Sequence, residues 1–117
     1  MPGKCVRGTV LDVNLDPTLG HEQAKTRPCV VIQNDIGNKY SPVKIVAVIT
    51  GAENVPKLYP SNALLKKGDG GLPKDSVVLC NQLRSIDEMR LGRIYGQLSP
   101  EAMRRVDLAL KSSLGLT

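Results

Sequence analysis

Residues 15–50 read LDPTLGHEQAKTRPCVVIQNDIGNKYSPVKIVAVIT, and this stretch decides the fold. A polar loop leads into the apolar run at 29–33, and a second apolar stretch at 43–50 ends on Thr50. The first run is rich in β-branched residues and the second alternates along its length, which is typical of strands. Arg27 and Thr50 therefore each lie at the edge of a predicted strand, where a rigid scaffold can hold a reactive group.

The chain on either side of this stretch shows further strand patterns and one helix. Ser99 is a favoured N-cap, Pro100 suits the first helical position and Gly115 suits a C-cap, so we expect a helix between them. The remaining expected elements are strands at 6–15, 62–65, 76–83 and 93–98, a turn at 34–38, a mobile tip at 66–71, and a turn or single helical turn at 85–87. Short strands followed by one closing helix predict an α+β fold, a small curved antiparallel sheet or barrel packed by a helix.

Length and composition bound the class of protein. The 117 residues suit one domain, 1–117, with one core. Hydrophobic residues make up 41% of the chain but aromatic residues only 3%, so the core must come from Val, Ile, Leu and Ala. A net charge of +5 favours a polyanionic partner, either nucleic acid or an acidic protein segment.

Several classes of protein are disfavoured. The three cysteines have no CxxC spacing, which indicates buried thiols in a reducing cytosol rather than a disulfide framework. With one histidine and no cysteine cluster, we expect neither a metal site nor a cofactor. No apolar run approaches the roughly 20 residues of a membrane span, and no signal peptide is evident at the N-terminus. We therefore expect a cytoplasmic protein.

The polar loop and the end of the second strand offer the chemistry of RNA cleavage. The 2′-OH of RNA can attack its own phosphorus, so a protein needs only to move protons and to stabilise phosphate charge. Arg27 suits the phosphate and Thr50 can donate a hydrogen bond to it, while His21 and Glu22 are candidates for proton transfer. The residues alone also allow a solvated Arg27, a structural Thr50 and a surface ion pair of Glu22.

Other polar residues suggest how a nucleic acid could be bound. Gln82, at the end of a predicted strand, could hydrogen-bond a base edge, and with few aromatic residues for stacking such hydrogen bonds gain importance. Five basic residues allow two interpretations: they form one basic surface, or they are scattered over a solvated face. These residues are Lys39, Lys44, Arg84, Arg90 and Arg93.

Taken together, these pieces resemble the MazF/PemK/Kid family of toxin endoribonucleases. The matching pieces are Arg7-Gly8, 15–18, Glu22-Gln23, Arg27-Pro28, 30–35, 49–50, 75–77, 82–87, 90–91 and 112–116. They cover nearly the whole chain in order, and segment 33–42 is especially similar to the MazF branch from Gram-positive-type bacteria.

The resemblance implies a fold, a reaction and a set of partners. The implied fold is an SH3-like antiparallel β-barrel with a C-terminal helix, working as a homodimer. The implied activity is metal-independent, sequence-specific cleavage of single-stranded RNA that leaves a 2′,3′-cyclic phosphate and a 5′-OH, and the implied inhibitor is an acidic, MazE-like antitoxin segment. The residues that would carry this are catalytic Arg27 and Thr50, Glu22 as a possible proton acceptor, and RNA-binding Leu19, His21, Gln23, Lys25 and Gln82.

Two other functions remain open on the same fold. One is a gyrase poison similar to CcdB, which acts by binding a protein, and the other is a noncatalytic SH3-like binding module. A protein that only binds has no need of the pair formed by Arg27 and Thr50, so the pair favours the ribonuclease.

Overall fold

Six strands form one antiparallel sheet within residues 5–22 and 25–117, which are the residues that the computed structural model describes. The strands are β1 (Thr9–Asn14), β2 (Thr26–Val31), β3 (Val43–Gly51), β4 (Asn62–Leu65), β5 (Ser76–Asp87) and β6 (Leu91–Gln97). Two α-helices and three single 3₁₀ turns complete the fold: α1 (Asp35–Tyr40), α2 (Pro100–Leu114), η2 (Ala52–Asn54), η3 (Asp69–Gly71) and η4 (Glu88–Arg90).

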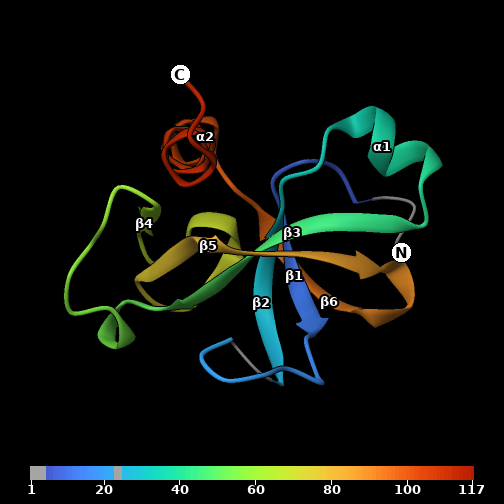
Figure 1. Ribbon diagram of the computed structural model, residues 1–117, viewed down its shortest axis with the longest axis horizontal. Coiled ribbons are helices and arrows are strands. Elements are labelled where there is room, and N and C mark those ends of the chain that lie inside the picture. The colour runs from blue at the N-terminus through green and yellow to red at the C-terminus, as the bar shows by residue number, and fades with distance from the viewer. Residues whose placement is uncertain (1–4, 23–24) are drawn as a thin grey trace.

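The sheet is bent and open rather than a fully closed barrel. Its strand order is β4-β5-β3-β2-β1-β6, so β4 and β6 are the edges. Figure 1 shows the long strands β3 and β5 crossing the molecule while β1, β2 and β6 lie at an angle to them. The expected α+β class with a C-terminal helix is confirmed, and the barrel describes the curvature of the sheet more than its pairing.

The two faces of the central strands bury separate hydrophobic cores. Alternate residues of β2 and β3 divide between them, with Val30 and Ile49 in one core and Cys29 and Val48 in the other. Helix α2 covers the first core through Ala102, Val106, Ala109 and Leu110. Because both faces are covered, the central strands need apolar residues at nearly every position, which explains the continuous run in the sequence.

Helix α2 follows the predicted capping. The Ser99 hydroxyl accepts a hydrogen bond from the Ala102 amide, and Gly115 ends the helix in the left-handed conformation at φ 71°. In Figure 1 the helix lies beside β4 and β5, away from α1.

Three local predictions were wrong. Residues 34–38, expected as a turn, start the short helix α1, where the Asn34 side chain accepts a hydrogen bond from the Gly37 amide. The expected mobile tip at 66–71 is anchored, since the Asp69 carboxylate accepts hydrogen bonds from the amide and hydroxyl of Ser99. Strand β5 runs on through the turn expected at 85–87.

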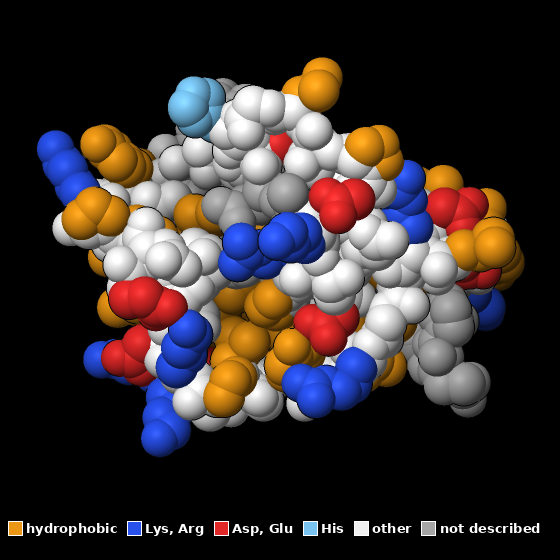
Figure 2. All heavy atoms as spheres, turned by 90° about the horizontal axis from the view of Figure 1, so that it is seen from below, with side chains coloured by type: hydrophobic (Ala, Val, Ile, Leu, Met, Phe, Trp, Pro, Cys, Tyr) orange, Lys and Arg blue, Asp and Glu red, His pale blue; other side chains and the backbone are white. Residues whose placement is uncertain are grey.

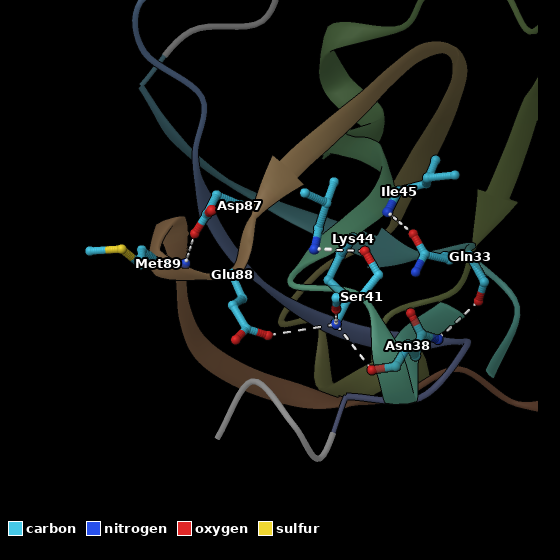
Figure 3. Close-up of polar contacts among 9 residues, drawn as sticks. Gln33, Asn38, Ser41, Lys44, Ile45, Asp87, Glu88 and Met89 are labelled. Carbon is cyan, nitrogen blue, oxygen red and sulfur yellow. Dashed lines mark hydrogen bonds and ion pairs between the residues drawn. The ribbon is translucent and has the colours of Figure 1, made fainter. Parts of the chain in front are cut away.

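Lys44 lies in the interior instead of on a basic surface. Its side chain is fully buried, and its ammonium donates hydrogen bonds to the backbone oxygens of Asn38 (3.0 Å) and Ser41 (2.7 Å). The Glu88 carboxylate lies 3.7 Å from the same nitrogen. Figure 3 shows these groups converging from α1, β3 and η4. Lys44 thus ties the end of α1 to the sheet, and a basic surface including it is excluded.

The buried thiols lead to a labelling prediction. Burial raises the pKa of Cys29 and of Cys80 from 9.0 to about 12. At about pH 8 both thiols of the folded protein stay protonated, so iodoacetamide should leave them unmodified while it alkylates the unfolded chain. The pKa of each thiol is higher in the folded protein than in the unfolded chain, so the two buried thiols stabilise the fold at a pH below the unfolded pKa. This contribution to the free energy of unfolding is lost as pH rises through the folded pKa of about 12. Peptide-level mass spectrometry after timed alkylation measures this, and rapid labelling of native Cys80 would contradict it.

Candidate active site

Strand register brings Arg27 and Thr50 to one place. Strands β2 and β3 pair antiparallel with Cys29 opposite Val48. Continuing this antiparallel register by two residues places Arg27 on β2 opposite Thr50 on β3. Both line one cavity of about 230 Å³. Arg27 and Thr50 therefore lie at one edge of the central strands and line the same cavity.

The 3₁₀ turn η2 completes the wall of this cavity next to Thr50. The turn follows β3 directly and is fixed to the segment just before β5 by a hydrogen bond from the Ala52 amide to the Asp75 backbone oxygen. It carries Asn54 back to β3, where its side-chain amide donates a hydrogen bond to the Thr50 hydroxyl oxygen at 3.0 Å. Thr50 itself is 5% exposed, so its hydroxyl is held in a defined environment.

Both charged residues that line this cavity are cationic. Lys74 lines it together with Arg27, and among the described lining residues there is no carboxylate and no imidazole. The Lys74 ammonium pairs with the exposed Glu53 carboxylate at 2.5 Å, and this hydrogen bond lowers the pKa of Glu53. The cavity can therefore accept a phosphate, whose charge Arg27 would balance.

Tyr95 closes the cavity from β6. Its hydroxyl donates a hydrogen bond to the Asp12 carboxylate at 2.8 Å, and the Arg93 guanidinium lies 4.4 Å from its ring centre. Burial, followed by the hydrogen bond to Asp12, raises the pKa of Tyr95 above its usual value of 10.0. The phenol therefore stays protonated near neutral pH and acts as a wall rather than as a base.

A bulge in β5 forms a second cavity. Leu83 pairs with Ala47 while Leu79 pairs with Val48, so residues 80–82 of β5 have no partner on β3. A cavity of about 270 Å³ opens here, lined by His21, Glu22, Asn81, Gln82, Leu83 and Arg84. The Gln82 amide reaches the His21 backbone oxygen at 3.3 Å, which ties the loop after β1 to the bulge.

The structure thus divides the predicted residues between two cavities. Arg27 and Thr50 share the first, whereas His21, Glu22 and Gln82 line the second. The Glu22 carboxylate accepts a hydrogen bond from the Leu19 amide at 2.8 Å.

The remaining predicted RNA-binding residues lie in the loop that joins β1 to β2. Leu19 is 82% exposed, and Lys25 is exposed with a φ of 66°. Gln23 lies outside the described residues. This loop projects at the lower end of the molecule in Figure 1. Figure 2, seen from that end, shows Lys and Arg side chains interspersed with acidic ones rather than a continuous basic field.

The sequence reading missed Asn54, Lys74 and Tyr95 as wall residues. Tyr95 and Lys74 reach the cavity only through the packing of η3 and β6 against the central strands, which no local pattern reveals. For Asn54 a signal exists, because an amide four residues after a strand-ending Thr can turn back and cap it.

Two negative findings concern the residues that the structure describes. Within 5–22 and 25–117, no three His, Cys, Asp or Glu residues come together as a group that could hold a metal ion. Over the same ranges, no helix has the length and apolar character to cross a membrane.

Comparison with solved structures places this fold among the MazF toxins. MazF from Deinococcus radiodurans superposes with a TM-score of 0.78 at 26% identity, covering 95% of this chain and 96% of that one. A mycobacterial endoribonuclease solved in complex with its cognate antitoxin superposes with a TM-score of 0.79 at 20% identity, covering 96% of each chain. The fold is therefore the small α+β fold of these toxins.

Sequence comparison identifies the family. The family model described as PemK-like, MazF-like toxin of type II toxin-antitoxin system matches residues 6–114. The protein named endoribonuclease MazF from Staphylococcus saprophyticus is 46% identical over 110 residues, which cover 94% of this chain and 91% of that protein. This chain belongs to the PemK-like, MazF-like toxins of type II toxin-antitoxin systems.

Proposed function

We propose that this toxin is a metal-independent, sequence-specific endoribonuclease that cuts single-stranded RNA at the cavity of Arg27 and Thr50. The observation that carries the proposal is that these two side chains, from neighbouring strands, line one cavity whose other charged lining residue is Lys74. The high identity to a protein named endoribonuclease MazF supports the reaction class.

The chemistry follows from the groups in this cavity. The ribose 2′-oxygen attacks the adjacent phosphorus and loses its proton to a base, while the bond to the 5′-oxygen breaks and that oxygen gains a proton. Arg27 binds the non-bridging phosphate oxygens through its planar fork and stabilises the charge that grows on them. The Thr50 hydroxyl donates a hydrogen bond to the same phosphate. The products are a 2′,3′-cyclic phosphate and a 5′-OH.

The second cavity gives the RNA a second place to bind. Its amide, guanidinium and carboxylate groups match the hydrogen-bonding edges of bases, and Gln82 would contact one such base. Leu19, His21, Gln23 and Lys25 of the adjoining loop would contact the rest of the strand. Glu22 would accept the first proton only when the RNA lies across both cavities, because its carboxylate belongs to the second.

The partners of this toxin follow from its family and its charge. An antitoxin is implied by the type II system, and an acidic, MazE-like segment would complement the net charge of +5 and compete with RNA for the same surface. We propose that the chain works as a homodimer in the cytoplasm, where its RNA substrate is found.

The decisive experiment is cleavage of a long single-stranded RNA in EDTA, with the ends of the products mapped. We expect cuts at a short recurrent sequence, each leaving a 2′,3′-cyclic phosphate and a 5′-OH. A single 2′-deoxy substitution at the mapped nucleotide should block that cut and leave the other sites unaffected. Intact RNA with folded protein would overturn the proposal, and it would favour a toxin that binds a protein such as gyrase.

A further inference from the structure

The Asn54 side chain forms a hydrogen bond with the hydroxyl of Thr50. Its side-chain nitrogen lies 3.0 Å from the Thr50 hydroxyl oxygen, and both residues line the cavity of Arg27. The turn that carries Asn54 is fixed independently by backbone hydrogen bonds from Ala52 to Asp75 and from Val55 to Ala52. The turn therefore does not depend on the side-chain amide of Asn54, which forms its hydrogen bond with Thr50 instead.

The direction of this hydrogen bond decides where the Thr50 proton points. A threonine hydroxyl has one proton to donate and two lone pairs that accept. The Asn54 amide occupies one lone pair, so the proton of Thr50 cannot point towards Asn54 and remains available to another acceptor. Within the described part of the chain, Thr50 donates that proton to no protein group. The Thr50 hydroxyl can therefore point its proton into the cavity that Arg27 also lines, towards an acceptor bound there.

We infer that Asn54 is a positioning residue that fixes the Thr50 hydroxyl as a hydrogen-bond donor to the scissile phosphate. The inference rests on the proposed function. Asn54 does not touch the RNA in this arrangement; it removes the alternative orientations in which Thr50 would present a lone pair to a negatively charged phosphate. The hydroxyl is thereby oriented before the RNA binds, and the transition state gains a donor without a cost of reorganisation.

The test is a double-mutant cycle on single-turnover cleavage with protein in saturating excess. Asn54→Ala should slow cleavage roughly tenfold, with the dissociation constant of uncut RNA changed by less than about twofold. Thr50→Val removes the hydroxyl while keeping the shape, and adding Asn54→Ala to it should cause no further loss, because Asn54 acts only through that hydroxyl. A purely structural role of Asn54 would slow the Thr50→Val protein by the same factor again.

A second variant reverses the polarity of the contact. In Asn54→Asp a carboxylate of nearly the same size can only accept, so it accepts the hydrogen bond that the Thr50 hydroxyl would otherwise donate to the phosphate, and it adds negative charge beside that phosphate. Cleavage should be slower than in Asn54→Ala. The matched control is Asn62→Ala, which removes a side-chain hydrogen bond to the Tyr59 amide before β4 and should cleave at the wild-type rate.

The outcomes separate this inference from the proposed function. Wild-type rates in Asn54→Ala or in Asn54→Asp, while Thr50→Val is impaired, would overturn the role of Asn54 and leave the ribonuclease intact. Equal effects of Asn54→Ala with and without the Thr50 hydroxyl would do the same. A wild-type protein that cuts no RNA would instead overturn the proposed function itself.

Discussion

Replacing Arg27 with alanine is expected to slow RNA cleavage by roughly 10³-fold, the loss typical of removing a group that stabilises transition-state charge. Arg27 faces a cavity in which Lys74 is the other lining cation and is already paired with Glu53. Water that replaced the guanidinium could not reproduce its paired, charge-assisted hydrogen bonds to a phosphate. Thr50→Ala should reduce cleavage in the same assay.

Two matched variants show whether the loss comes from the guanidinium itself. Arg27→Lys keeps the charge but loses the planar fork, so we expect a rate between those of the wild type and Arg27→Ala. Arg104→Ala removes an exposed arginine from α2 and should leave the rate unchanged. Rates are compared under single turnover, and urea unfolding establishes that each variant is folded. Wild-type cleavage by folded Arg27→Ala would remove Arg27 from the mechanism.

The sequence predicted those parts of the fold that local patterns determine. The alternation at 43–50 located β3, and the pattern of Ser99, Pro100 and Gly115 located α2 from its first turn to its end. The short helix α1 was missed: the Asn34 side chain caps its start, and the buried ammonium of Lys44 on β3 binds the backbone oxygens of Asn38 in the helix and Ser41 just after it. A lysine in an alternating strand is expected to be exposed, so the sequence did not predict the burial of Lys44.

The same distinction holds for the site. Arg27 and Thr50 could be named in advance because each was expected at the edge of a strand and the family resemblance assigns both. That they line one cavity follows from the register of β2 and β3, which the sequence did not predict. The separation of Glu22 from them was not predictable, since it depends on the bulge in β5 that creates the second cavity. Lys74 and Tyr95 reach the first cavity by packing of segments that are distant in sequence from Arg27 and Thr50.

The wall that carries Lys74 and Tyr95 depends on one glycine. Gly71 ends the turn η3 with a φ of 76°, and a Cβ at this position would lie 2.2 Å from the backbone oxygen of Tyr95. That oxygen belongs to strand β6 and cannot move aside as a side chain could. The close approach packs η3 against β6, and η3 leads directly into Leu72, Pro73 and Lys74 of the first cavity.

Gly71→Ala is therefore expected to lower the free energy of unfolding by about 3 kcal/mol, the sum of a left-handed backbone penalty and a clash with backbone. Gly68→Ala is the matched control, since Gly68 also has a positive φ, 95°, but a Cβ there would meet nothing within 4 Å. It should lose about 1 kcal/mol from the backbone penalty alone. Urea unfolding of both variants measures the difference. Equal losses would show that η3 can move away from β6, and the wall of the first cavity would then not be rigid.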